Sequence, residues 1–186
     1  METFIVLVLL VILFSIWLTL TQRKLSALDE NVRNAMGQIG IQISSRQDMT
    51  AALTEMARKY AVQERMQLSG RFQSQRKMIT AMSTPEQVQK QDRLLEEILE
   101  KVRILGEKYP ELQEERNYAR CMEAAESYGK MVRTSCLIYN DSVAKLNRAV
   151  RKLPASLLAG MLGFHQEEYL ELNEDEEERK QYGIIQ

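Results

Sequence analysis

The sequence predicts an all-α protein, in which an N-terminal transmembrane helix is followed by an antiparallel bundle of three to four long helices. An uncharged apolar run opens the chain, and helix-favouring residues dominate, with only 8 glycines and 3 prolines in 186 residues. Two long stretches repeat apolar side chains at alternating steps of three and four. Strand signals are nearly absent. We divide the chain into an anchor (residues 1–24), a helical bundle (25–166) and an acidic C-terminal tail (167–186).

The predicted membrane anchor is the run FIVLVLLVILFSIWLTL, from Phe4 to Leu20. As a helix it is about 25 Å long, and with its flanking threonines it can span a bilayer. A cleavable signal peptide needs basic residues before a shorter apolar run and a small-residue cleavage site after it, and neither is present. Trp17 lies near the end of the run, where amphipathic aromatic residues prefer the interface. Glu2 precedes the run and Gln22-Arg23-Lys24 follows it, so the positive-inside rule places the N-terminus outside and the bundle in the cytoplasm.

Two heptad seams predict the bundle. The first continues from the anchor in one long helix to about Gln67, and a polar layer at Gln42 and Arg46 interrupts it without a slip in register. Its apolar members are Leu25, Leu28, Val32, Ala35, Ile39, Met49, Leu53, Met56 and Tyr60. The second seam consists of Tyr118, Met122, Ala125, Gly129, Val132, Cys136, Tyr139, Val143, Leu146, Val150 and Leu153. A stripe this long needs a partner helix, and the first long helix is the obvious candidate.

Local signals set the remaining boundaries. Thr84, Pro85 and Gln87 form a capping-box start for a shorter helix that covers the other side of the bundle and ends at Gly106. Pro110 opens the last helix, which is expected to continue to Lys152 before Pro154 stops it. The short apolar segment 155–164 is expected to cap the bundle or touch lipid. The acidic tail, with its run Glu174–Glu178, is expected to be solvated.

Catalytic chemistry is not expected. His165 is the only histidine, so no His-based dyad, multi-histidine metal site or di-metal carboxylate site can be assembled within one chain. Cys121 and Cys136 lie at seam positions about 22 Å apart along a helix, out of reach of a disulfide, and an apolar seam suppresses a thiolate. No phosphate-binding loop is present, and we expect no enzyme activity, cofactor or metal. A net charge of −1 without a basic stripe argues against nucleic acid.

The stretch YNDSVAKLN, residues 139–147, contains the polar residues that need explaining. Asn140 and Asn147 are seven apart and lie beside the second seam, where interhelical hydrogen bonds that fix register are favoured over a binding or reactive role. Asp141 and Lys145 are spaced for a surface ion pair. We expect the polar groups of the first long helix to meet those of the last. The predicted structural polar layer comprises Gln42, Arg46, Asp48, Asn140 and Asn147.

Five motifs together carry a family resemblance. They are QIGIQISSRQDM, KYAVQE, EKYPEL with NYA, YNDSVAKLN, and LPASLLAGMLGF with a nearby YLE. Their order and spacing, including the thirty-residue interval from Tyr109 to Tyr139, resemble the LemA-like membrane proteins of bacteria over the chain from the anchor to about Tyr169. The resemblance implies a single anchor in a bacterial cell membrane and an antiparallel helical bundle, with a biochemical activity that is unestablished for the family.

The chain departs from this family pattern at four positions. Gly40 stands where the family usually has Asp, and Ala52 where it usually has Asn. Gly129 and Cys136 replace a Glu and an Arg seven residues apart. The joint loss of two opposite charges is consistent with the two having compensated each other.

These observations favour a non-enzymatic scaffold or adaptor at the membrane, whose bundle face or acidic tail recruits a protein partner. The alternative is a bundle that organises the bilayer, alone or by self-association. A third hypothesis is that the bundle is an enzyme or binds a small-molecule ligand. The expected partners are the lipid bilayer through the N-terminal helix, a protein, and a second copy of the chain, because heptad seams also allow homo-oligomers.

Overall fold

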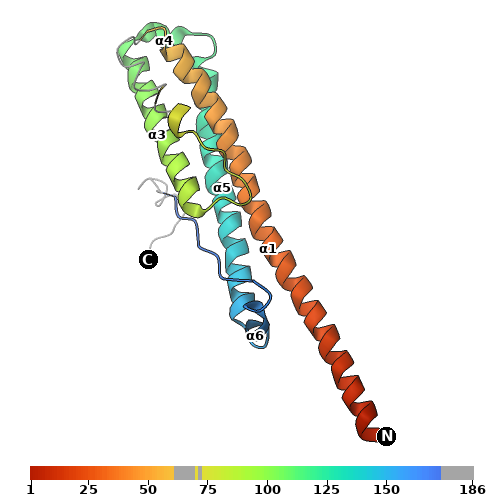
Figure 1. Ribbon diagram of the computed structural model, residues 1–186. Helices are drawn as coiled ribbons and strands as arrows, with labels where there is room; N and C mark the ends of the chain where they lie inside the picture. Colours follow the sequence, from red (N-terminus) through yellow and green to blue (C-terminus); the bar gives the residue numbers. More distant parts are fainter. Residues whose placement is uncertain (61–69, 71–72, 173–186) are drawn as a thin grey trace, which may run out of the picture.

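A computed structural model describes residues 1–60, 70 and 73–172 of the chain. Its helices are α1 (Glu2–Ala57), α3 (Pro85–Lys108), α4 (Pro110–Glu114), α5 (Tyr118–Arg151) and α6 (Ala155–Ala159). Among the described residues there is no strand, so the predicted all-α class is confirmed. Figure 1 shows α1, α3 and α5 side by side as a long bundle, with the first part of α1 extending beyond it.

Helix α1 is both the apolar N-terminal segment and a member of the bundle. Its 56 residues make it about 84 Å long. Phe4 and Leu20 are 71% and 60% exposed and Trp17 is half-buried, whereas Leu25 is fully buried. Within the described part of the chain, α1 is the one helix with a segment long and apolar enough to cross a membrane, which is consistent with single-pass anchoring.

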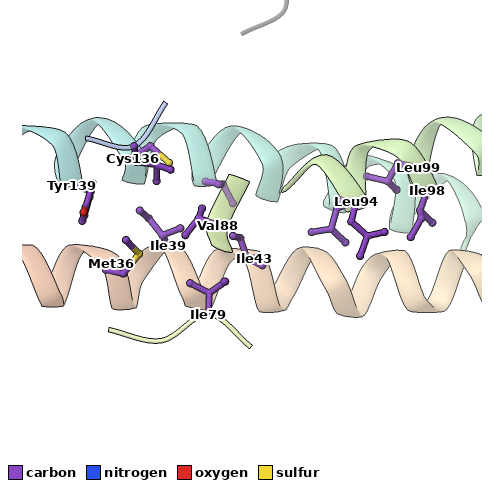
Figure 2. Packing of buried hydrophobic residues seen from close by; sticks show 14 of the residues in the cluster. Met36, Ile39, Ile43, Ile79, Val88, Leu94, Ile98, Leu99, Cys136 and Tyr139 are labelled. Carbon is purple, nitrogen blue, oxygen red and sulfur yellow. The ribbon is translucent and has the colours of Figure 1, made fainter. Parts of the chain in front are cut away.

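The two predicted seams face each other. Helix α5 packs along α1 more extensively than any other element does, and the seam residues Val32, Ile39, Val132 and Val143 are buried. Figure 2 shows Tyr139 and Cys136 of α5 across from Met36 and Ile39 of α1. Leu153, 69% exposed, is the member of the second seam that the packing leaves in solvent.

Helix α3 covers the other side of the bundle. It begins at the predicted capping box, in which the Gln87 amide donates to the Thr84 side chain and the Thr84 amide to the Gln87 side chain. Its buried stripe packs into the same core as both seams, as Figure 2 shows for Leu94, Ile98 and Leu99.

Two contacts fix the antiparallel register of α1 and α5. The Arg46 guanidinium lies against Gly129, where an added Cβ would be 3.1 Å from its carbon atom. At the far end, just outside the two helices, Lys59 two residues after α1 has its Nζ 2.8 Å from Oε1 of Glu115, three residues before α5. Each step toward the C-terminus of α5 therefore matches a step toward the N-terminus of α1. Arg151, 22 residues beyond Gly129, lies level with Lys24, 22 residues before Arg46.

The predicted boundary at Gly106 is wrong by two residues, and the predicted unbroken last helix is divided. Helix α3 continues to Lys108, α4 ends at Glu114, and α5 begins at Tyr118. Gly106 allows the Tyr118 side chain to lie close to the backbone of α3, since a Cβ at this position would be 2.5 Å from the Tyr118 hydroxyl oxygen. The chain must reverse direction between α3 and α5, and Glu115 turns it with a non-helical ψ of 127°.

Two further predicted boundaries differ from those in the structure. The first long helix, expected to reach Gln67, ends at Ala57, and residues 61–67 lie outside the described part. The tail, expected to be solvated from residue 167, instead lies along α5 up to residue 172 (Figure 1), with Leu170 only 2% exposed. The physical reason is that Asn140 and Asn147 of α5 form hydrogen bonds with the backbone of this segment. The acidic run that follows lies outside the described residues.

Candidate functional site: a buried polar layer and a clamped C-terminal segment

A buried ion pair joins α1 to α3 in the middle of the bundle. Arg46 Nη1 donates to Asp92 Oδ1 at 2.6 Å, and the two side chains are only 8% and 7% exposed. Gly129 on α5 makes room for the guanidinium because it has no side chain. The pair is thus positioned by all three long helices, and the Arg46 Nε atom is buried without a hydrogen-bond partner among the described residues.

The electrostatics of this layer are set by desolvation. Burial raises the pKa of Asp92, and the positive charges of Arg46 and then Arg133 oppose this shift. One turn along α3, burial followed by the negative charge of Asp92 raises the pKa of Glu96. Arg133 Nη2 lies 3.3 Å from Glu96 Oε1. Two cations and two carboxylates therefore share this layer and balance in formal charge.

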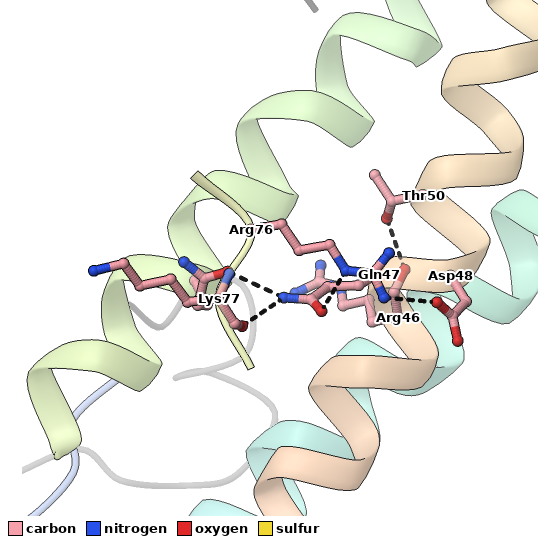
Figure 3. Close-up of polar contacts among 7 residues, drawn as sticks. Arg46, Gln47, Asp48, Thr50, Arg76 and Lys77 are labelled. Carbon is pink, nitrogen blue, oxygen red and sulfur yellow. Dashed lines mark hydrogen bonds and ion pairs between the residues drawn. The ribbon is translucent and has the colours of Figure 1, made fainter. Parts of the chain in front are cut away.

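An amide network fastens the connection before α3 to both neighbouring helices (Figure 3). Gln47 Nε2 donates to Gln91 Oε1 at 3.0 Å and to the Lys77 carbonyl oxygen at 3.1 Å. The Lys77 amide donates to the same Gln91 oxygen at 2.9 Å, and Gln91 Nε2 donates to the Gln75 carbonyl oxygen at 2.8 Å. Both glutamine side chains are buried, so these bonds satisfy polar atoms that water cannot reach.

Two asparagines of α5 hold the C-terminal segment in an extended conformation. Asn147 Nδ2 donates to the Glu167 carbonyl oxygen and its Oδ1 accepts the Glu167 amide, both at 2.8 Å. Asn140 makes the same pair of bonds with Leu170, again at 2.8 Å. Seven helical residues rise about 10.5 Å and three extended residues about 10 Å, so the two spacings match. We call these four bonds the asparagine clamp.

Neighbouring side chains complete the docking of this segment. The Tyr139 hydroxyl donates to the Glu168 carbonyl oxygen at 3.0 Å, and Gln89 Nε2 of α3 donates to that of Glu171 at 2.7 Å. Burial, followed by the charges of Glu167 and Glu168, raises the pKa of Tyr139 to about 12. The hydroxyl therefore keeps its proton, which it needs to donate.

The structure has a buried polar layer at Arg46, but the other predicted members lie elsewhere and the predicted pairing is wrong. Arg46 pairs with Asp92 of α3 rather than with an asparagine of the last helix, and Gly129, which has no side chain, leaves room for its guanidinium. Asn140 and Asn147 bind backbone atoms of the C-terminal segment and make no bond to α1.

The other polar predictions have separate outcomes. Asp48 lies at the surface with its side chain 60% exposed, 2.8 Å from Arg76 Nη2, and Gln42 is half-buried. The predicted surface pair is confirmed, with Lys145 Nζ 2.6 Å from Asp141 Oδ2.

Sequence reasoning missed Asp92, Gln47 and Gln91. A signal for two of them was present, since Gln91 and Asp92 fall between Val88 and Leu95 on the apolar stripe of the shorter helix. A polar residue in such a stripe indicates a buried partner.

The contacts of this site connect α1, α3, α5 and the C-terminal segment to one another. Burial, with a smaller contribution from the charge of Asp92, raises the pKa of the Cys136 thiol to about 12, so the thiolate is suppressed as the seam position predicted. Among these residues no three His, Cys, Asp or Glu side chains gather as metal ligands would. An open groove of about 610 Å³ lies between α1 and α5, and its lining includes Met49, Ala52, Met56, Arg120 and Cys121.

These features define a class of protein, a helical bundle whose first helix extends into an apolar segment long enough to cross a membrane. Residues 35–183 match the LemA family, and the chain belongs to this family, as the five motifs predicted. A search of curated proteins finds no match to the chain.

Proposed function

We propose that this protein is a non-enzymatic scaffold of the bacterial cell membrane, anchored by one helix, that presents its acidic C-terminal segment to a protein partner from the cytoplasmic side. The observation that carries the proposal is the asparagine clamp, which attaches residues 167–170 to α5, four residues before the acidic run in the sequence. Two asparagine side chains, with four hydrogen bonds, are committed to holding this piece of backbone.

The continuity of α1 supports a positioning role. The apolar segment and the buried seam belong to one uninterrupted helix, so the bundle is held at a fixed distance from the membrane. Gln89 and Tyr139 hold the segment beside the N-terminal part of α3. The acidic run Glu174–Glu178 follows within a few residues of this attachment.

The charge of the run defines the chemistry of the partner. Five consecutive carboxylates favour a basic protein surface, and an attraction of this kind weakens as ionic strength rises. Partner binding through the run is therefore expected to be sensitive to salt, whereas binding to an apolar face of the bundle is not.

Affinity capture of the full chain from native membranes tests this role. One comparison variant ends after Leu172, which removes the acidic run and keeps the asparagine clamp. A second keeps the full length but replaces the carboxylates of Glu174–Glu178 with the corresponding amides. A matched control neutralises Glu97 and Glu100, which are exposed carboxylates of α3.

A partner recovered near stoichiometrically with the full chain and the control, but lost from both tail variants, supports the scaffold. Recovery of the same partner with all four proteins moves the binding site to the bundle. If every version brings down only itself and lipid, the adaptor role is refuted, and a self-associating bundle that organises the membrane becomes the better account. Protease added outside intact cells tests the orientation, because cleavage of the tail contradicts a cytoplasmic bundle.

A further inference from the structure

We propose that the bundle has a second membrane contact, at which α6 and its flanking residues lie in the interface of the leaflet next to the bundle and bind anionic phospholipid. This contact rests on the proposed anchoring of α1, since it requires that α1 spans the bilayer. The occupant is the lipid surface itself, and it covers a patch that we call the α6 patch, formed by Leu153, Leu157 and Met161 with the nearby cations of α5 and α1.

The register of the bundle places the α6 patch at membrane depth. Arg151, the last residue of α5, lies level with Lys24, four residues after the apolar run of α1 ends. Figure 1 shows α6 at the end of the bundle from which the apolar part of α1 emerges. Trp17 and Leu18 are half-buried while the apolar side chains of residues 4–14 are exposed, so the protein begins to shield α1 at this level.

The apolar side chains of the patch are exposed rather than packed on the bundle. Leu153, Leu157 and Met161 are 69%, 70% and 85% exposed, and they are spaced four residues apart. Ala159 is buried and holds α6 against the protein, which leaves the larger side chains outside. Exposed leucine and methionine next to a membrane span are suited to the boundary between headgroups and acyl chains.

The charged side chains that the structure describes around the patch are all cations. Five exposed cations lie near this end of the bundle: Arg23 and Lys24 on α1, Arg148 and Arg151 on α5, and Lys152 directly after α5. Neither residues 3–28 nor residues 142–166 contain a carboxylate side chain. In the described part of the chain, the next carboxylates after these two stretches, Asp29 and Glu167, lie on the side away from the membrane. A cationic rim around an apolar centre complements an anionic lipid surface.

Quenching of tryptophan fluorescence by brominated phospholipid tests the contact on the full chain. The protein is placed one copy per nanodisc in phosphatidylcholine with phosphatidylglycerol, with bromine atoms near the glycerol end of the acyl chains. Trp17 of the unmodified chain reports on the anchor, because it is the only tryptophan. The contact is read from Leu157→Trp in a Trp17→Phe background.

Leu137→Trp in the same background is the matched control. Leu137 is 66% exposed, close to the 70% of Leu157, but it lies 14 residues before Arg151 on α5, about 21 Å farther from the membrane. Both sites accept tryptophan at the surface. We expect Leu157→Trp to lose most of its emission in the brominated bilayer and Leu137→Trp to keep its emission.

The electrostatic part is tested by adding Arg148→Gln and Lys152→Gln to the Leu157→Trp chain. Arg151 is kept because its Nε donates to the Asn147 carbonyl oxygen at 3.3 Å. Quenching is expected to fall in these variants, and to fall in the parent when phosphatidylglycerol is omitted. Equal quenching under all these conditions overturns the preference for anionic lipid.

The outcomes separate this contact from the anchor. If Trp17 is quenched and Leu157→Trp is not, the second contact is refuted and the anchor stands. A blue-shifted but unquenched Leu157→Trp emission means that protein covers the patch, which also refutes the lipid contact. If Trp17 itself escapes quenching, the proposed anchor fails and the second contact fails with it.

Discussion

The Arg46–Asp92 ion pair offers the sharpest test of how this bundle is held together. The two charged atoms are 2.6 Å apart and both side chains are more than nine-tenths buried. Removing one partner leaves an uncompensated buried charge, which costs about 3–5 kcal/mol. For a chain of this size that corresponds to a fall in melting temperature of roughly 6–20 °C. We expect this loss for Arg46→Met and for Asp92→Leu separately.

The double variant is expected to behave differently from either single one. Replacing both charges with apolar side chains of similar volume removes their desolvation penalty, so its stability should equal that of the parent or exceed it by about 1–4 kcal/mol. The raised pKa of Asp92 in the folded protein is a sign of this desolvation penalty, since burial disfavours the charged form of the carboxyl group. The two substitutions are thus expected to be strongly non-additive.

Urea unfolding in detergent micelles, followed by helical circular dichroism, measures these free energies. Asp141→Asn is the matched control. Its partner Lys145 also lies at 2.6 Å, but the two side chains are 60–62% exposed, so the expected cost is below about 1 kcal/mol. If Arg46→Met and Asp92→Leu cost as little as this control, then burial does not govern the pair and the reasoning fails.

Three further predictions concern single positions. Gly40→Ala places a Cβ 2.3 Å from the Ile79 backbone oxygen and is expected to destabilise the protein by about 1–3 kcal/mol. In the control Gly37→Ala the nearest atom is 3.9 Å away, so this variant is expected to gain about 1 kcal/mol of helix propensity. Equal stability of the two variants in urea unfolding contradicts the close approach at Gly40. Asn147→Ala is expected to accelerate hydrogen exchange of the Glu167 amide, whereas Asn147→Asp, which keeps an acceptor oxygen, is expected to protect this amide better than Asn147→Ala does. Unchanged exchange in both variants means that the asparagine clamp does not hold the segment. Iodoacetamide at about pH 8 is expected to label the half-buried Cys121 and spare Cys136 until urea is added. Because the pKa of Cys136 is raised from 9.0 to about 12 in the folded protein, the thiol's contribution to folding stability is complete below pH 9.0 and is lost as the pH rises toward 12. If the free energy of unfolding does not fall over this pH range, the burial of Cys136 is contradicted.

Two departures from the family pattern lie next to the ion pair. Gly129 contacts the Arg46 guanidinium, and the charge of Asp92 contributes to the raised pKa of Cys136. The Glu and Arg that the family usually carries at these positions would bring a second pair of opposite charges to the same layer. Here Asp92 provides the carboxylate for Arg46 from α3, and the joint loss of the other pair leaves the formal charge of the layer unchanged. That the two replaced charges compensated each other stays a prediction.

The sequence by itself determined the helical class of this protein and the faces that its long helices bury, but not every helix boundary. Apolar side chains at steps of three and four follow directly from helical geometry, so both seams and the stripe of α3 could be read before any packing was known. The capping box at Thr84 was equally local, because its bonds close within four residues. The apolar run of residues 4–20 could be identified as a candidate membrane span from its length and lack of charge alone.

Tertiary structure alone decided which polar groups meet. Arg46 and Asp92 are 46 residues apart, and their pairing depends on the space above Gly129 on a third helix. Asn140 and Asn147 looked like interhelical contacts because their spacing fits any neighbour along α5, whether helix or extended chain. A periodic apolar face specifies only that something must cover it, whereas a hydrogen bond needs one partner at one distance and angle. That partner is set by the path of the whole chain, and no local pattern records it.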